Sequence, residues 1–460
     1  MEPNKRLVVD LTLEEEEEVA NPPLFYQNSF PELEAVEEAF CTRNVWELAE
    51  ERELQEVYLL TYVMDPKVVL AKFPAKMFAV PVTLVCGSHS ISQEEFGKVF
   101  RSEFSRLVIP VLPSKFGTYH TKMLVLFYAK GVRVVVHTAN LESSNLFFHA
   151  EGTWFQDFPL RGSQPSASTN SEFEIDLARV LESSGIPEAK AMLSRFDFAT
   201  AEVALVASIP RATAYSLPGE VRANGLGRVR FLLQQEAERD PQWAARCKHW
   251  PVIVQTSSLG TMTSKLGESW FFNELGAAMG AQTPEQMRLV AISQADVHQD
   301  NVFGPVAAAA TFHKQEHFAH PAIQLAASCW TPSNPLLVTR SLVLPHIKTY
   351  ACASDSGEVA WMILGSHNCT KAAWGYATAA ATGKFTCLSH EVSVMFLPSY
   401  MKRAGNRRFN CVAATWQTVS DKRSCFTSTD KEKGGFLPLP YKLPVTRYSQ
   451  VDTTPYTMDY

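Results

Sequence analysis

The sequence lacks the cysteine spacing of a disulfide framework or a zinc site. Its 460 residues include nine cysteines, an odd number, and none of them forms a C-x-x-C pair. No apolar run reaches the roughly 18 to 20 residues that cross a bilayer, and no basic segment followed by an apolar one stands at the N-terminus. We therefore expect an intracellular protein in a reducing compartment, without a membrane segment.

The chain also lacks the net positive charge that a nucleic-acid-binding protein often carries. Its net charge is −6 at pH 7, but residues 1–20 hold seven acidic and two basic side chains and so contribute −5. The remaining 440 residues carry only −1. A local basic groove is compatible with that balance.

Residues 1–22 contain too little apolar surface to fold and are expected to form a flexible acidic tail. Within this tail, residues 7–18 read "LVVDLTLEEEEE", a short β-prone run followed by acidic residues. The run resembles a SUMO-interacting motif, in which an added strand pairs with the edge of a partner's sheet. A solubilising acidic tail is the alternative. The residues that would form the added strand are Val8, Val9, Asp10, Leu11 and Thr12.

Beyond the tail, short apolar runs rich in β-branched and aromatic residues alternate with amphipathic segments. This alternation predicts an α/β fold with a buried sheet in each of two halves. A chain of this length also favours two domains. We place the halves at residues 23–212 and 213–460. The proline-rich "FLPLPYKLPVTRY" near the end is expected to be an extended closing segment.

One motif occurs twice at a nearly constant offset. His120 and Lys122 are followed, after a turn and an apolar run, by Asn140 in a T-x-N triplet. His346 and Lys348 lie 226 residues later, and they precede Ser366 and Asn368 in an S-x-N triplet, with the two asparagines 228 residues apart. Residues i and i+2 of a strand point to the same face, about 6.5 to 7 Å apart. Two such sets, related by a pseudo-twofold axis, would surround one point with paired imidazoles, ammoniums and carboxamides.

These groups suit cleavage of a phosphodiester without a metal ion. One neutral imidazole can attack phosphorus and form a phosphohistidine, while a protonated one donates to the leaving oxygen and later takes a proton from water. The ordinary imidazole pKa of about 6.5 makes both forms accessible at neutral pH. Lysine and asparagine side chains would stabilise the charge on the nonbridging oxygens. The alternative for a single copy is a set of surface residues at strand ends.

At these motifs the chain resembles the tyrosyl-DNA phosphodiesterases, a branch of the phospholipase D superfamily. The superfamily pattern H-x-K-x-x-x-x-D has lost both aspartates here, to Phe127 and Ala353, as that branch shows. The stretches "KFGTYHTKM", "QTSSLG", "PHIKTY", "NCTKAAWG" and "EVSVMFLPS" agree with it. The resemblance implies two similar α-β-α sandwich halves with mixed sheets, related by a pseudo-twofold axis, and an active site at their interface.

The resemblance also implies a role for each matching residue. His120 would be the nucleophile and His346 the general acid and then base, while Lys122, Lys348, Asn140 and Asn368 hold the phosphate. Glu391 matches a glutamate that orients an active-site histidine. Glu151 stands where the family commonly has glutamine, which leaves its role open. Phe116 matches an aromatic residue that stacks on DNA bases, with a buried strand-end aromatic as the alternative. The serines that would contact the DNA backbone are Ser257 and Ser258.

The implied substrate is single- or double-stranded DNA whose 3′ end is linked through phosphate to a tyrosine of a topoisomerase I-derived peptide. A phenol with a pKa near 10 leaves more readily than an alkoxide, so attack favours the tyrosyl bond. Because this selectivity rests partly on the leaving group, other 3′ adducts and slow nucleoside removal are expected side activities. A repair role implies a nuclear monomer, with cytoplasm or mitochondrion left open, no cofactor, and SUMO-bearing partners through residues 7–18. The alternatives are a superfamily relative acting on lipid or unmodified nucleic acid, and a noncatalytic scaffold.

Two other patterns carry weaker signals. His313, Glu316, His317 and His320 have spacings that a metal could use, but a surface loop or helix is favoured. Cys369, beside Asn368, is either a reactive thiol or a small buried packing residue, and packing is favoured.

Overall fold

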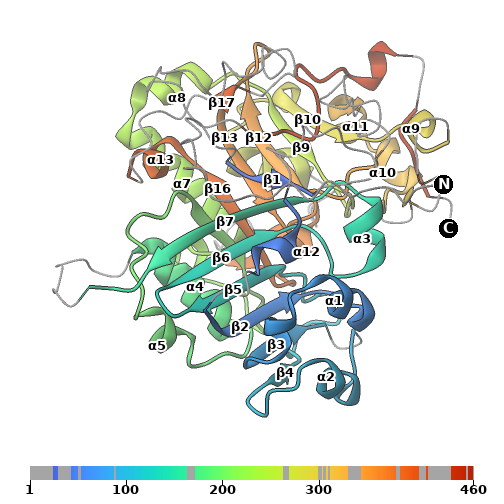
Figure 1. Cartoon of the computed structure of the whole chain (residues 1–460). Coiled ribbons are helices and arrows are strands. Elements are labelled where there is room, and N and C mark those ends of the chain that lie inside the picture. The colour runs from blue at the N-terminus through green and yellow to red at the C-terminus, as the bar shows by residue number, and fades with distance from the viewer. Residues whose placement is uncertain are drawn as a thin grey trace, which may run out of the picture.

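The structure is a computed structural model of the whole chain. It describes residues 24–28, 43–49, 53–87, 90–162, 171–262, 269–298, 303, 307–308, 311–329, 343–379, 384–403, 411–412, 437–451 and 454–458. No helix within these ranges is long and apolar enough to cross a membrane. Both regular sheets are mixed, and helices flank them (Figure 1).

The first sheet has seven strands in the order β1-β7-β6-β5-β2-β3-β4. The neighbours β2, β3 and β4 are parallel, and the remaining pairs are antiparallel. The centre of the sheet is the β5–β6 hairpin, which joins two runs of buried β-branched and aliphatic residues. The strands are β1 (Tyr26–Gln27), β2 (Leu54–Thr61), β3 (Val82–Cys86), β4 (Arg106–Val108), β5 (Met123–Tyr128), β6 (Gly131–His137) and β7 (Gly152–Pro159).

The second sheet has eight strands. Seven follow the order β11-β10-β9-β12-β13-β16-β8, and β17 pairs with β13 off this path. A separate two-stranded sheet joins β14 (Tyr376–Ala379) and β15 (Lys384–Thr386). The strands of the larger sheet are β8 (Ala204–Ser208), β9 (Val252–Gln255), β10 (Met287–Ala291), β11 (Ala327–Cys329), β12 (Thr349–Ala353), β13 (Glu358–Gly365), β16 (Glu391–Phe396) and β17 (Cys411–Val412).

The two sheets repeat one topology. Reading both orders from the parallel edge, β4-β3-β2-β5-β6-β7-β1 corresponds to β11-β10-β9-β12-β13-β16-β8 with the same strand directions. The repeated H-x-K motif precedes equivalent strands, β5 and β12. Since β8 is the counterpart of β1 and pairs with β16, a division by sheets lies before residue 204. The expected division between residues 212 and 213 instead assigns β8 to the first half.

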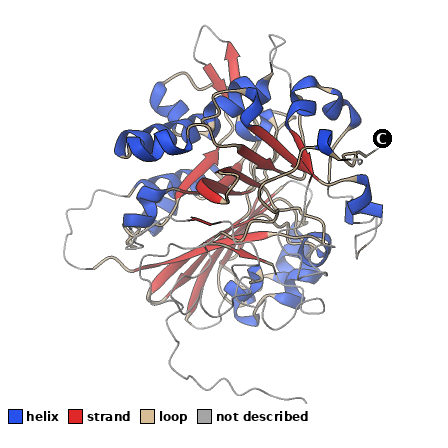
Figure 2. Cartoon of the chain, turned by 90° about the horizontal axis from the view of Figure 1, so that it is seen from above, coloured by secondary structure: helices blue, strands red, loops and turns tan. Residues whose placement is uncertain are grey.

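Helices cover the outer face of each sheet, and α4 and α5 fill one side of the space between the sheets (Figures 1 and 2). The α4 helix begins after Ser171, whose hydroxyl caps the Glu174 amide. The helices are α1 (Pro66–Lys72), α2 (Gln93–Val99), α3 (Ser143–Phe148), α4 (Glu172–Ser183), α5 (Ala189–Leu193), α6 (Pro218–Arg222), α7 (Gly225–Arg239), α8 (Pro241–Cys247), α9 (Gln294–His298), α10 (Gln315–Ala319), α11 (Pro321–Ala326), α12 (Lys371–Trp374) and α13 (Pro398–Arg403), with a π-helix at Phe271–Gly276.

The inner faces of the two sheets share one hydrophobic core, which joins the halves. Val134 and Val136 of β6 pack in the same cluster as Met362 of β13 and Val392 of β16. Two further clusters lie on the outer faces, one beneath α1 and α2 and the other beneath α7, α8 and α12. The closing segment adds alternate buried side chains to the shared core, as an extended chain does: Leu437, Leu439, Tyr441 and Leu443.

Candidate active site

Both His–Lys pairs lie in extended backbone just before a strand, rather than within one as the sequence pattern predicts. The strands β5 and β12 begin one residue after Lys122 and Lys348. The backbone ahead of each strand pairs with the opposite half instead: the His120 amide donates to the His390 carbonyl at 2.9 Å, and the His346 amide donates to the Ala150 carbonyl at 3.0 Å. These matching bridges bring the two motifs to the interface between the halves.

The segment that leads to His120 contacts the second half closely. A Cβ atom at Gly117 would come within 1.9 Å of the Leu388 carbonyl oxygen, so no other residue fits there without movement of the backbone. The Thr118 amide donates to the Ser389 hydroxyl at 3.1 Å. The glycine of "KFGTYH" therefore allows the first motif to dock on the second half.

Each histidine contacts a glutamate from the opposite half. Nδ1 of His120 lies 2.8 Å from Oε2 of Glu391, and Nδ1 of His346 lies 2.6 Å from Oε1 of Glu151. An Nδ1–H donated to a carboxylate leaves the Nε2 lone pair for another partner. Neither Nε2 has a hydrogen-bond partner among the described residues. Both imidazoles are thus oriented through Nδ1.

Each glutamate is held in turn by a hydroxyl of its own half. Ser366 donates to Oε2 of Glu391 at 2.6 Å, and Thr138 donates to Oε2 of Glu151. Thr138 and Ser366 are the first residues of the T-x-N and S-x-N triplets, but the sequence pattern does not reveal this contact. The site consists of two crossed chains of hydroxyl, carboxylate and imidazole.

Burial and neighbouring charge set the protonation of the two carboxylates differently. Burial raises the pKa of Glu151 to about 6, although Lys348 and the Thr138 hydroxyl oppose it. Burial also acts on Glu391, but the facing His120, His367 and Lys122 outweigh it, and the pKa of Glu391 falls below its ordinary value. Glu391 is therefore ionised over a wider pH range than Glu151.

The same forces lower the pKa values of both histidines and both lysines, so they favour the neutral forms of these side chains. Burial, and then repulsion from Lys348 and other cations, places the pKa of His346 well below its ordinary value. Burial lowers the pKa of His120 despite the attraction of Glu391. Burial lowers the pKa of Lys122 to about 8 and that of Lys348 to about 7, while Glu391 and Glu151 respectively oppose the fall. Negative charge brought into this site would raise each of these pKa values.

The two lysines take equivalent positions behind the histidines. Each side chain is fully buried, and each Nζ donates to the carbonyl oxygen of the histidine two residues before it. Lys122 also lies over the ring of Tyr62, 5.7 Å from its centroid, and that ring is 5.4 Å from the His120 ring. No motif marks Tyr62 in the sequence, so only the fold reveals its place in the site.

The two asparagines have different surroundings. The Oδ1 atom of Asn368 accepts from the Ser258 amide at 3.1 Å and from the Ser257 hydroxyl at 3.3 Å. These bonds fix the orientation of the carboxamide, so the two serines contact the site through Asn368. Asn140 is buried, its Nδ2 lies 3.3 Å from Glu142, and its Oδ1 has no hydrogen-bond partner among the described residues.

Phe116 lies four residues before His120 and is 72% exposed, which excludes the buried aromatic alternative. Lys115 stands beside it, with Nζ 5.2 Å from the ring centroid. An exposed ring next to an ammonium group suits base stacking. The tail residues Val8, Val9, Asp10, Leu11 and Thr12 lie outside the described residues.

The weaker sequence signals do not join the site. His313 is fully buried while Glu316 is exposed, and no group of three or more His, Cys, Asp or Glu within the described ranges could hold a metal ion. Burial raises the pKa of the Cys369 thiol, which disfavours a reactive thiolate.

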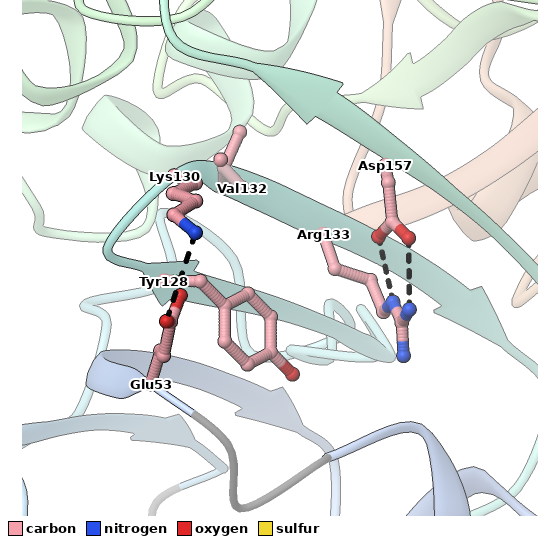
Figure 3. Close-up of a pocket in the computed structure, with 7 residues that line it drawn as sticks. Glu53, Tyr128, Lys130, Val132, Arg133 and Asp157 are labelled. Atoms are coloured by element: carbon pink, nitrogen blue, oxygen red, sulfur yellow. Dashed lines mark hydrogen bonds and ion pairs between the residues drawn. The ribbon is translucent and has the colours of Figure 1, made fainter.

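A pocket of about 410 Å³ lies at the turn of the β5–β6 hairpin, the end away from His120 (Figure 3). Its charged side chains neutralise one another: Lys130 lies 4.0 Å from Glu53, and Arg133 holds Asp157 through two contacts of 2.7 and 2.8 Å. A pocket with paired charges offers little to a charged substrate. The interface between the halves remains the better candidate.

Comparisons with known proteins point to one family. A model of the tyrosyl-DNA phosphodiesterase family matches residues 28–449. Tyrosyl-DNA phosphodiesterase 1 of Arabidopsis thaliana is 28% identical over 452 residues, covering 89% of this chain and 70% of the relative. The protein of the same name from Drosophila melanogaster is 24% identical over 433 residues, covering 89% and 68%.

Solved structures support the fold. The crystal structure of the yeast tyrosyl-DNA phosphodiesterase superposes with a TM-score of 0.67 at 14% identity, covering 95% of this chain and 99% of that one. A mutant of the yeast enzyme gives a TM-score of 0.71 at the same identity and coverage. The phospholipase D-like arrangement expected from the sequence is confirmed.

Proposed function

Because the chain belongs to the tyrosyl-DNA phosphodiesterase family, we propose that it hydrolyses the bond between a DNA 3′-phosphate and a topoisomerase I tyrosine through a covalent phosphohistidine, without a metal ion. The observation that carries the proposal is the pair of crossed His–Glu contacts at one interface. Two imidazoles oriented by carboxylates can divide nucleophilic attack and proton transfer between them.

In the first step, Nε2 of His120 attacks phosphorus while its Nδ1–H donates to Glu391. The bond from phosphorus to the tyrosine oxygen breaks, and His346 gives that oxygen a proton from Nε2. His346 is neutral in the free site because burial and cations depress its pKa. The bound phosphodiester brings one negative charge, which raises that pKa and favours the protonated form required.

In the second step, water attacks the phosphohistidine. Neutral His346 takes a proton from the water, the bond from phosphorus to Nε2 breaks, and DNA leaves with a 3′-phosphate. Glu151 stabilises the His346 imidazolium that donates in the first step and forms again in the second, because it lies 2.6 Å from Nδ1 of His346. A phenol leaves far more readily than an alkoxide, so attack favours the tyrosyl bond, with other 3′ adducts as slower substrates.

The cations supply the charge stabilisation that a metal ion gives in other phosphodiesterases. Lys122 and Lys348 are the buried ammonium groups nearest the two imidazoles, and phosphate binding raises the pKa of each toward full protonation. The amide group of Asn368, held through its Oδ1, is oriented for donation to a nonbridging oxygen. The same proposal assigns DNA base stacking to Phe116 and places the enzyme in the nucleus as a monomer, with SUMO-bearing partners through residues 7–18.

The test uses a single-stranded oligonucleotide with a 3′-phosphotyrosine, in EDTA. Wild type should convert it to a 3′-phosphate, and His120→Ala should not. His346→Ala should accumulate a DNA–protein adduct that survives denaturation. A phospholipid offered in parallel separates a lipid phosphodiesterase from a DNA enzyme. Conversion only after a divalent metal is restored would overturn the metal-independent mechanism.

A further inference from the structure

His149 is a buried histidine that the proposed mechanism does not use. It follows α3, and only 3% of it is exposed. Its Nδ1 lies 2.6 Å from the Ser144 carbonyl oxygen, and its Nε2 lies 2.5 Å from the Ala307 carbonyl oxygen. A carbonyl oxygen only accepts hydrogen bonds, so both ring nitrogens have to carry a proton to satisfy these contacts. A neutral imidazole has one N–H and would leave one short contact between two acceptors.

The position of this ring matters for the second histidine of the site. Its centroid is 5.8 Å from that of His346, and His149 stands two residues before Glu151 on the same segment. The charged groups facing His346 are Glu151, Lys348, His149, Lys122 and His120. Those facing Glu151 include Lys348, His149 and Lys122. Positive charge on His149 lowers the pKa of both members of the Glu151–His346 pair.

We propose that His149 is a positioning residue, a fixed imidazolium that sets the protonation of the Glu151–His346 pair and so the pH range of proton transfer. This inference rests on the proposed role of His346 as general acid and base. The first histidine has different companions among the described residues: the ring beside His120 is Tyr62, and the imidazole that faces Glu391 is His367, whose pKa burial lowers to about 4, so it is neutral near pH 7. The proposed imidazolium stands beside His346 and not beside His120, and this difference distinguishes the two halves of the site.

The charge state can be measured without any substrate. In the full chain labelled with ¹⁵N-histidine, the His149 signals are identified by their loss from a His149→Gln variant. Both ring nitrogens should have the shifts of protonated nitrogen from pH 6 to pH 8. A nonprotonated ring nitrogen at neutral pH would overturn the proposal, whatever the enzyme does to DNA.

The functional consequence requires a matched pair of variants. His149→Gln removes the charge and His149→Lys keeps it, and thermal melting checks that each variant folds. A unit charge near 6 Å, at an effective dielectric constant of about 20, shifts a pKa by roughly two units. Both limbs of the pH–rate profile should therefore move up by about that amount in His149→Gln, and neither should move in His149→Lys.

The direction of the shift distinguishes charge from simple packing. With the cation removed, His346 holds its proton to higher pH, so cleavage persists at alkaline pH while the covalent adduct survives longer at acidic pH. A His149→Gln profile that superimposes on wild type, or a His149→Lys profile that shifts in the same way, would contradict the proposal. If wild type fails to cleave the phosphotyrosyl substrate, the proposed function fails, while the NMR result still decides the charge of His149.

Discussion

The first and second His–Lys–Asn sets have equivalent backbones but different electrostatic surroundings. His120 faces a glutamate whose pKa is lowered, whereas His346 faces one whose pKa is raised to about 6. A carboxylate that stays ionised orients a nucleophile at all working pH values. A carboxylate that titrates near neutrality suits a histidine that has to release and recover a proton. Under the proposed function, the two copies of the motif differ in role because their neighbours differ.

The largest effect is expected when either buried ammonium group is removed. Lys122→Met and Lys348→Met should each lower kcat/KM by roughly 10²- to 10³-fold, because each ammonium stabilises charge on the phosphoryl oxygens. Steady-state cleavage of the phosphotyrosyl oligonucleotide measures the effect. The exposed Lys98→Met serves as control, since its ion pair with Glu94 lies on the surface. A loss smaller than tenfold in both variants would exclude charge stabilisation by these residues.

Phe116 allows a test confined to the first half. Phe116→Ala should raise KM roughly 5- to 150-fold, the kinetic equivalent of about 1 to 3 kcal/mol of base stacking, with kcat nearly unchanged. Phe104→Ala is a matched control, because this phenylalanine is similarly exposed at 73% and precedes Phe116 by 12 residues in the sequence. Equal effects from the two variants would show that Phe116 has no specific contact with DNA.

The difference between the two glutamates predicts a difference in pH dependence. Glu151 protonates as the pH falls through about 6, so the wild-type rate should fall there. Glu151→Gln cannot titrate, and this acid limb should move to lower pH, with a roughly tenfold loss at neutral pH because the imidazolium of His346 is less stabilised. The pH–rate profile from pH 5 to 9 measures both. If Glu151→Gln keeps the acid limb of the wild-type profile near pH 6, a group other than Glu151 is responsible for that limb.

The smallest expected effect is on folding stability, where substitutions of the two glutamates should have opposite signs. The pKa of Glu151 is higher in the folded than in the unfolded state, so its ionisation costs stability as the pH rises from 4.5 through about 6. Glu151→Gln should therefore gain up to about 2 kcal/mol at pH 7, for a shift of about 1.5 units. The pKa of Glu391 is lowered, so it contributes stability above pH 4.5 that is lost at lower pH, and Glu391→Gln should be destabilised at pH 7. Denaturant unfolding at pH 7 and pH 4 checks both signs, and the same sign for both variants would contradict the account.

The sequence predicts the duplication because the H-x-K and S/T-x-N spacings are local and the strands around them have strong β propensity. The equivalence of β5 and β12 follows from that local pattern, although the pattern places each His–Lys pair within its strand and the structure places it just before. The position of β8 does not, because pairing with β16 joins residues about 190 positions apart and nothing in "ALVAS" marks its partner. Long-range pairing is decided by the packing of the whole sheet.

The crossed contacts of the site are also beyond prediction from the sequence. Resemblance assigns Glu391 and Glu151, but which histidine each one holds depends on how the halves dock, and their partners lie 271 and 195 residues away. No motif marks His149 in the sequence, and its proposed role rests on two carbonyl oxygens that only the fold brings to its ring.

The central claim is that the two histidines divide the work, with His120 alone forming the covalent bond. The most direct measurement traps the DNA–protein adduct in His346→Ala at alkaline pH, where phosphohistidine survives, and locates the modified residue by mass spectrometry. The account predicts phosphate on the peptide that contains His120 and no adduct in His120→Ala. Phosphate on the peptide that contains His346 in either wild type or His120→Ala would contradict it.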